Sequence, residues 1–134
     1  MVGAWENGVA SHCIDGVTTY NAYWPGSLDF ICHSSGEGDT LVITVTGYNV
    51  DKVIVYNRLD LTTELQYRIL RYDLQYTNDF GGQSVIYQSS FGGTVLSTYT
   101  FHLNQKFVSI VSSTYIALTE VELYYNNVKI PTTG

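Results

Sequence analysis

In the segment VIVYNRLD (53–60), four apolar residues are followed by a polar cluster that contains Arg58 and Asp60. An arginine guanidinium carries five N–H donors in a rigid plane, which suits recognition of ligand oxygen atoms. A carboxylate two residues away can hold that side chain in one rotamer and so lower the cost of ordering it on binding. Two interpretations compete. Either the pair lies in a solvated turn, where a surface ion pair contributes roughly 0–1 kcal/mol, or a rigid strand presents it to a ligand.

Other residues with reactive side chains give weaker signals. His12-Cys13 and Cys32-His33 are neighbouring pairs, and neighbours on an extended segment point to opposite faces, so neither pair has the spacing of zinc ligands. Glu120 and Glu122 share one face of an expected strand, whereas a glycosidase needs two carboxylates facing each other across a cleft. The sequence has no G-x-S-x-G, phosphate-loop or H-E-x-x-H motif. We therefore expect no enzymatic activity.

Composition limits the possible partners. The net charge is −6, only 13% of the 134 residues are charged, and the six lysines and arginines are spread singly. Nucleic acids bind clustered cations, so we exclude them, and an anionic membrane surface is disfavoured for the same reason. The longest apolar runs reach about five residues, whereas a membrane-spanning helix needs about twenty. No signal-peptide pattern follows Met1, and the compartment stays open, with an extracellular or particle-surface location favoured.

Period-two patterns recur along the chain. TLVITVTG (40–47), RYDLQYTND (71–79) and STYTFHLN (97–104) each alternate apolar with polar residues, as half-buried strands do. Twelve tyrosines and many threonines and valines also favour strands. Only LTTELQYRILRY (61–72) could form a short helix, and its tyrosine and threonine content argues against one. Short strands joined by Gly, Asn and Ser turns predict an all-β fold, a single antiparallel β-sandwich domain spanning residues 1–134.

Four fragments occur in a characteristic order, namely ASHCIDG (10–16), VDKVIVYNRLD (50–60), RILRYDLQYTND (68–79) and YIALTEVELY (115–124). They resemble the discoidin or coagulation-factor C-type family, and within it the fucose-binding F-type lectins. The similarity covers nearly the whole chain. It implies a discoidin-like jelly-roll sandwich and a non-catalytic role in binding carbohydrate.

The resemblance also implies a sugar site. In F-type lectins the sugar is gripped by an early-loop histidine and two arginines, and the matching residues are His33, Arg58 and Arg68, with Asp60 as the acidic member of R-x-D. On this view the guanidiniums donate to sugar hydroxyls, and His33 could donate to a ring or hydroxyl oxygen. Alternatively, His33 is a loop residue that binds no ligand. An aromatic ring would pack on the apolar face of the sugar, and the candidates are Tyr23, Trp24 and Tyr87.

The chain departs from the family at several of these positions. The loop from Asp60 to Arg68 is longer, and Leu61 and Thr62 stand where the family has paired cysteines. The family's disulfide from Cys32 cannot form, because its partner position is Thr119. A Cys13–Cys32 disulfide is possible, although the even cysteine count does not require it.

A structural calcium ion is the second implication of the resemblance. The matching residues are Asp15 and Glu120, with Thr18 or Thr19 and main-chain carbonyls as further ligands. Calcium takes six to eight oxygen atoms, and the DGVTTYN loop is rich in them. Alternatively, Asp15-Gly16 is only a turn and Glu120 an exposed strand residue.

The leading hypothesis is thus a calcium-stabilised lectin-like module whose partner is a glycan, with fucose-type sugars as the first guess. The alternative is a structural module that self-assembles into a homo-oligomer, or attaches to another protein, within a surface layer, fibre or virus particle. Tyr115, Tyr124 and Tyr125 would then cover a partner surface, since tyrosine is enriched in interfaces.

Overall fold

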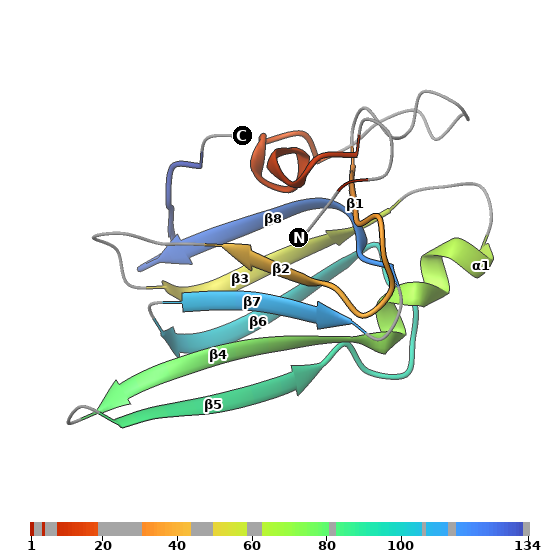
Figure 1. The fold of residues 1–134 in the computed structure, drawn as a ribbon. Helices are drawn as coiled ribbons and strands as arrows, with labels where there is room; N and C mark the ends of the chain where they lie inside the picture. Colours follow the sequence, from red (N-terminus) through yellow and green to blue (C-terminus); the bar gives the residue numbers. More distant parts are fainter. Residues whose placement is uncertain are drawn as a thin grey trace.

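A computed structural model describes the chain at residues 1, 4, 8–18, 31–43, 50–58, 63–80, 83–105, 107–112 and 115–132. Its strands form two antiparallel sheets that pack face to face (Figure 1). The first sheet has the order β1-β8-β3-β6, with β9 also paired to β8, and the second has the order β2-β7-β4-β5. The predicted β-sandwich is therefore confirmed.

The first sheet contains β1 (Cys32–His33), β3 (Val50–Asn57), β6 (Thr98–Gln105), β8 (Ala117–Tyr125) and β9 (Val128–Lys129). The second contains β2 (Thr40–Ile43), β4 (Tyr72–Phe80), β5 (Gln83–Ser90) and β7 (Phe107–Ser112). The described residues also form short helical segments, namely the 3₁₀ helix η1 (Ala10–Ile14), α1 (Thr63–Gln66) and the 3₁₀ helix η3 (Tyr67–Arg71).

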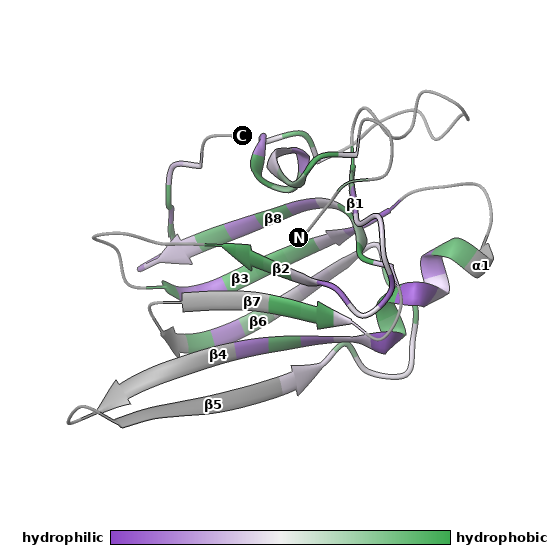
Figure 2. Cartoon of the chain, in the orientation of Figure 1, coloured by the Kyte–Doolittle hydropathy of each residue, from purple (hydrophilic) through white to green (hydrophobic). Residues whose placement is uncertain are grey.

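The core lies between the sheets and follows the alternation read from the sequence (Figure 2). Leu41 and Ile43 are buried, while Val42 between them is 49% exposed. Tyr72 and Leu74 of β4 are also buried, as predicted. Since one face of each strand enters the core, the register of these strands is fixed by burial.

The segment 61–72 was expected not to form a helix, and this is wrong for its described part, where α1 and η3 follow each other. Two helical turns are too short to show a 3.6-residue pattern, and tertiary packing overrides weak propensity. Ile69 is fully buried and Leu70 packs against the core. This helical connection carries Arg68.

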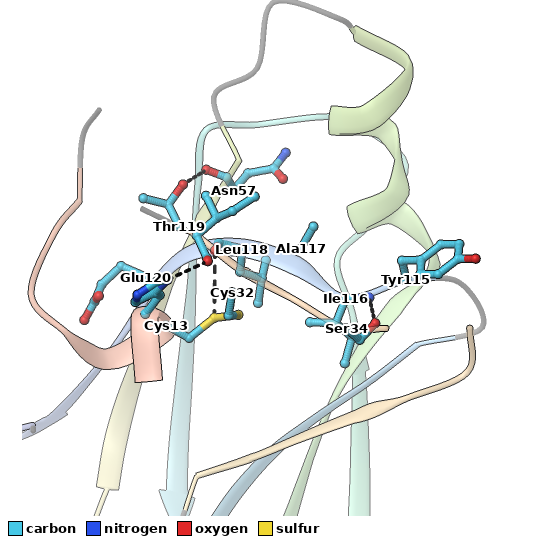
Figure 3. The surroundings of a disulfide bond; sticks show 12 residues. Cys13, Cys32, Ser34, Asn57, Tyr115, Ile116, Ala117, Leu118, Thr119 and Glu120 are labelled. Carbon is cyan, nitrogen blue, oxygen red and sulfur yellow. Dashed lines mark hydrogen bonds between the residues drawn. A yellow bond between two sulfur atoms is a disulfide. The ribbon is translucent and has the colours of Figure 1, made fainter. Parts of the chain in front are cut away.

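A disulfide joins Cys13 of η1 to Cys32 of β1, with a Cα–Cα distance of 5.3 Å (Figure 3). Both cysteines are buried beneath β8, where the Cys13 sulfur lies 3.8 Å from the Leu118 carbonyl oxygen. The disulfide thus holds η1 against the β1–β8 edge of the first sheet. Thr119, at the position of the family's cysteine, instead donates a hydrogen bond to the Asn57 carbonyl.

Candidate functional site

The three cationic or imidazole residues predicted to grip a sugar come from separate elements at one end of the sandwich, the end with α1 in Figure 1. His33 ends β1, Arg58 directly follows β3, and Arg68 lies in η3. β8, which begins at Ala117, starts at this same end. The positions result from where strands stop, because side chains at strand ends project from the rim of a sandwich.

Tyr72 links the two arginines. Burial raises the pKa of the Tyr72 phenol to about 12, while the hydrogen bond from the Ala117 amide and the positive charges of Arg58 and Arg68 oppose that rise. Both guanidiniums must therefore lie within electrostatic reach of one hydroxyl group. The two arginines, ten residues apart in sequence, therefore both lie on the side of the fold where β4 begins.

Tyr115 links Arg68 to His33. The Arg68 guanidinium carbon lies 5.3 Å from the centroid of the Tyr115 ring, within the range of a cation–π contact. The His33 and Tyr115 rings have their centroids 5.7 Å apart, with planes inclined by 39°. His33 and Arg68 thus contact the same tyrosine ring.

His33 is held in a defined orientation. It is only 3% exposed, its amide donates to the Gly8 carbonyl over 2.7 Å, and its Nδ1 lies 2.8 Å from the Ser34 carbonyl oxygen. A carbonyl oxygen can only accept, so Nδ1 carries the hydrogen. In a neutral ring Nε2 is then a hydrogen-bond acceptor. His33 therefore lies buried at the end of a strand and not in an exposed loop.

Arg58 does not lie in a solvated turn, since it is only 3% exposed. Its amide donates to the side-chain oxygen of Asn57 over 2.9 Å. The Asn57 side-chain nitrogen in turn donates to the carbonyls of Gln66 and Leu96, both at 3.2 Å. A buried cation is costly unless neighbouring groups compensate its charge, and Arg58 is thus part of the packed end of the sandwich.

Sequence reasoning did not identify Asn57, Ser34 or Tyr72 as parts of this region. Each is buried and uses its side chain to hold main-chain groups near the cluster. A buried polar residue at a strand end is the signal that could have found Asn57. The predicted residues Asp60, Tyr23 and Trp24 lie outside the described residues, and so does the side chain of Tyr87, whose backbone belongs to β5.

The residues predicted to bind calcium also come together. Glu120 of β8 is fully buried, and its Oε2 accepts a hydrogen bond from the Gly16 amide over 3.1 Å. Asp15, exposed at the end of η1, lies close enough to interact with the Glu120 carboxyl group. The alternative that Glu120 is an exposed strand residue is wrong, because η1 packs against β8.

The Glu120 carboxylate is poorly compensated by the chain itself. Burial raises its pKa to about 8, and the nearby Asp15 carboxylate adds to the rise, while the Gly16 amide opposes it. Its Oε1 is buried and has no hydrogen-bond partner among the described residues. An orphaned carboxylate oxygen beside a second carboxylate fits a cation, which would neutralise both.

Within the described part of the chain, further oxygen ligands would come from neutral groups. Among the described residues, no three His, Cys, Asp or Glu side chains lie close enough to hold a metal ion together. Two carboxylates with hydroxyl, carbonyl and water oxygens still match the oxygen preference of calcium. Thr18 is half-buried three residues after Asp15, and Thr19 lies outside the described residues.

Glu122, two residues further along β8, shows the contrasting case. Burial acts to raise its pKa, but hydrogen bonds from Lys129, Tyr56 and Tyr124 outweigh burial and lower it. The Lys129 ammonium lies 2.9 Å from Glu122 Oε2, and both tyrosine hydroxyls donate to Oε1. Glu122 is thus satisfied within the protein, whereas Glu120 is not.

Comparison with solved structures agrees with the fold. A fucose-binding module of Streptococcus pneumoniae, SpX-3, superimposes with a TM-score of 0.65 at 20% sequence identity, covering 93% of this chain and 90% of that chain. The lectin domain of lectinolysin, solved with Lewis B antigen, gives 0.64 at 19% identity, covering 92% and 89%. The CBM32-2 module of GH31, solved with GalNAc, gives 0.61 at 11% identity, covering 89% of each chain.

These likenesses confirm the resemblance seen in the sequence at the level of the fold. No protein-family model matches the chain, and no curated protein matches it significantly. None of the helices among the described residues is long and apolar enough to cross a membrane.

Proposed function

We propose that the chain is a non-catalytic, lectin-like carbohydrate-binding module. The observation that supports this proposal is that His33 and Arg68 both contact the Tyr115 ring, while Arg58 follows β3 at the same end of the sandwich. Two guanidinium groups, an imidazole and the Tyr115 ring at one end of the sandwich suit a monosaccharide, which offers hydroxyl groups on its edges and C–H groups on its faces.

Each side chain has a role that its chemistry permits. The guanidiniums of Arg58 and Arg68 donate to sugar oxygens and accept nothing. In a neutral His33 ring whose Nδ1 donates to the Ser34 carbonyl, Nε2 has the chemistry to accept a hydrogen bond from a sugar hydroxyl. A sugar hydroxyl that donates to His33 and accepts from an arginine would be satisfied both as a donor and as an acceptor. This differs from the donor role first expected of His33.

Fucose-type glycans are the first ligand class to test. The solved structures with the same fold include a fucose-binding module and a domain solved with Lewis B antigen. The R-x-D motif at Arg58 and Asp60 resembles that of the fucose-binding lectins. A GalNAc-bound module of the same fold makes galactose-type sugars the second class.

A calcium ion held by Asp15 and Glu120 completes the proposal. When bound, the ion would supply a partner for the buried Glu120 Oε1, which has no hydrogen-bond partner among the described residues. The Gly16 amide orients Glu120 from one side, and Asp15 Oδ1 accepts from the Val17 amide over 2.9 Å. Main-chain amides of the short loop after η1 thus bind both carboxylates.

A glycan array with matched variants tests the sugar site. Arg68→Ala removes one donor of the cluster, whereas Arg71→Ala removes an exposed arginine of the same helical turn. We expect Arg68→Ala to lose binding and Arg71→Ala to keep it, with both melting temperatures unchanged. Equal glycan binding by both variants would rule out this site. If the wild type binds no glycan on the array, the proposed function fails.

The assembly alternative is weakened by intramolecular contacts of the tyrosines invoked for it. Tyr115 contacts His33 and Arg68, and Tyr124 contacts Glu122 and Lys52. Tyr125 is the remaining candidate and is 41% exposed. Light scattering of the purified chain, with and without calcium, would reveal an oligomer.

A further inference from the structure

The main chain around Tyr115 is fixed by side chains as well as by strand pairing. The Tyr72 hydroxyl donates to the Tyr115 carbonyl over 2.7 Å and accepts from the Ala117 amide over 2.8 Å. Between them, the Ile116 amide donates to the hydroxyl oxygen of Ser34, and the Ile116 carbonyl accepts from the Ser34 amide (Figure 3). Residues 115–117 are therefore anchored just before β8 begins.

The Tyr115 ring projects from this anchored segment toward two members of the proposed grip. It contacts Arg68 through a cation–π geometry and His33 through a tilted ring contact. An arginine side chain loses much rotamer freedom when it binds a ligand. A ring that already restricts the guanidinium in the free protein removes part of that loss.

We infer that Tyr115 is a positioning residue of the sugar site, which holds Arg68 and His33 in the geometry that binds the sugar. This inference rests on the proposed function and adds to it a residue that the sequence had placed only in a possible partner surface. Tyr115 acts through its ring and its anchored backbone, so an aromatic ring at this position is what the site requires.

The alternative is that Tyr115 simply fills space at the end of the sandwich. The two hypotheses predict different glycan affinities for the double variant of Tyr115 and Arg68. If the ring positions Arg68, the loss caused by Arg68→Ala shrinks in a Tyr115→Leu background, because the guanidinium there is already misplaced. If the ring only fills space, the two losses multiply.

The test measures glycan affinity by titration calorimetry for Tyr115→Leu, Tyr115→Phe and the double variant with Arg68→Ala. We expect Tyr115→Leu to weaken Kd about 5- to 30-fold, or ~1–2 kcal/mol at 1.4 kcal/mol per tenfold. Tyr115→Phe should stay within about twofold of the wild type, since it keeps the ring quadrupole that attracts the guanidinium. Tyr125→Leu, an exposed tyrosine at the other end of β8, is the matched control and should bind as the wild type does.

Unchanged affinity in Tyr115→Leu, or equal losses in the Leu and Phe variants, would overturn the inference. NMR relaxation of the Arg68 Nε–H group supplies a readout without sugar. We expect this group to be ordered in the wild type and in Tyr115→Phe, but mobile in Tyr115→Leu. An Arg68 side chain equally mobile in all three proteins would also overturn the positioning role. A protein that binds no glycan but shows this ordering would lose the proposed function while keeping the Tyr115–Arg68 contact.

Discussion

The Thr119 hydroxyl donates a hydrogen bond to the main-chain carbonyl of Asn57 over 2.8 Å (Figure 3). Thr119 immediately precedes Glu120, and Asn57 immediately precedes Arg58. A second link runs through the disulfide, since Cys13 lies two residues before Asp15 and Cys32 lies next to His33. The proposed calcium and sugar sites therefore share two short, buried connections.

Calcium should tighten glycan binding through these connections, and glycan should tighten calcium binding by the same factor, because coupling between two binding sites is reciprocal. We expect a factor of about 5 or more, the lower end of typical coupling, measured by calorimetry with calcium or with chelator. Thr119→Val should reduce it to about twofold or less, since the valine cannot donate to Asn57.

The matched control for this experiment is Thr100→Val, which changes an exposed threonine of β6 and should leave the coupling intact. Identical glycan affinity with and without calcium in the wild type would contradict the coupling. That outcome would leave the two binding sites themselves standing.

Replacing both Cys13 and Cys32 with serine should lower the free energy of unfolding by about 3 kcal/mol, the loop-entropy value for a separation of 19 residues. Chemical denaturation measures this loss directly. Calcium and glycan affinity should fall as well, because the disulfide holds the Asp15 loop near His33. A double variant with wild-type affinity for both ligands would show that the other contacts of η1 are enough to hold the Asp15 loop in place. Both cysteines are buried, so a mild reductant should reach the disulfide of the native protein slowly. Labelling of the released thiols should therefore be slow as well.

Glu120→Gln removes the negative charge of the side chain and keeps its size, so it tests whether the calcium site needs that charge. In chelator this variant should melt at or above the wild-type temperature, because an amide in place of the carboxylate removes the burial cost of a charge and its repulsion by Asp15. Its melting temperature should no longer rise on adding calcium, whereas the wild type should gain several degrees. Glu37→Gln changes an exposed carboxylate and should respond as the wild type does. A calcium response retained by Glu120→Gln would remove Glu120 from the site.

The strands were predictable because their signal is local. Tyr72 and Leu74 alternate with polar residues over a single segment, and one sheet face buries them. The sequence could also place Arg58 after β3, because the apolar run stops there. Its burial could not be foreseen, since segments distant in sequence come together there, as the bonds of Asn57 to Gln66 and Leu96 show.

Long-range pairing was the main limit. Two cysteines allow a disulfide, but only the fold brings Cys13 and Cys32 to a Cα separation of 5.3 Å. Glu120 was placed with Asp15 by resemblance to a family, whereas its orphaned Oε1 follows from the packing of η1 on β8. The helical turn that carries Arg68 was missed because two turns are too short for a periodic pattern.

Tyr72→Phe should show how much the sugar site depends on the anchor of Tyr115. The variant keeps the buried ring and its edge contact with Phe91, but removes the hydroxyl that bonds both the Tyr115 carbonyl and the Ala117 amide. Leaving such buried groups unpaired typically costs about 1–3 kcal/mol. Denaturation with an unchanged m-value would report this as a loss of stability alone.

Glycan affinity of Tyr72→Phe should also fall, because residues 115–117 lose the bonds that fix them and the Tyr115 ring then restricts Arg68 less. Tyr67→Phe, which removes an exposed hydroxyl beside Arg68, should change neither stability nor affinity. If Tyr72→Phe loses stability but binds glycan as the wild type does, the hydroxyl supports the fold without ordering the site. If it matches Tyr67→Phe in both measurements, the Tyr72 hydroxyl is no anchor.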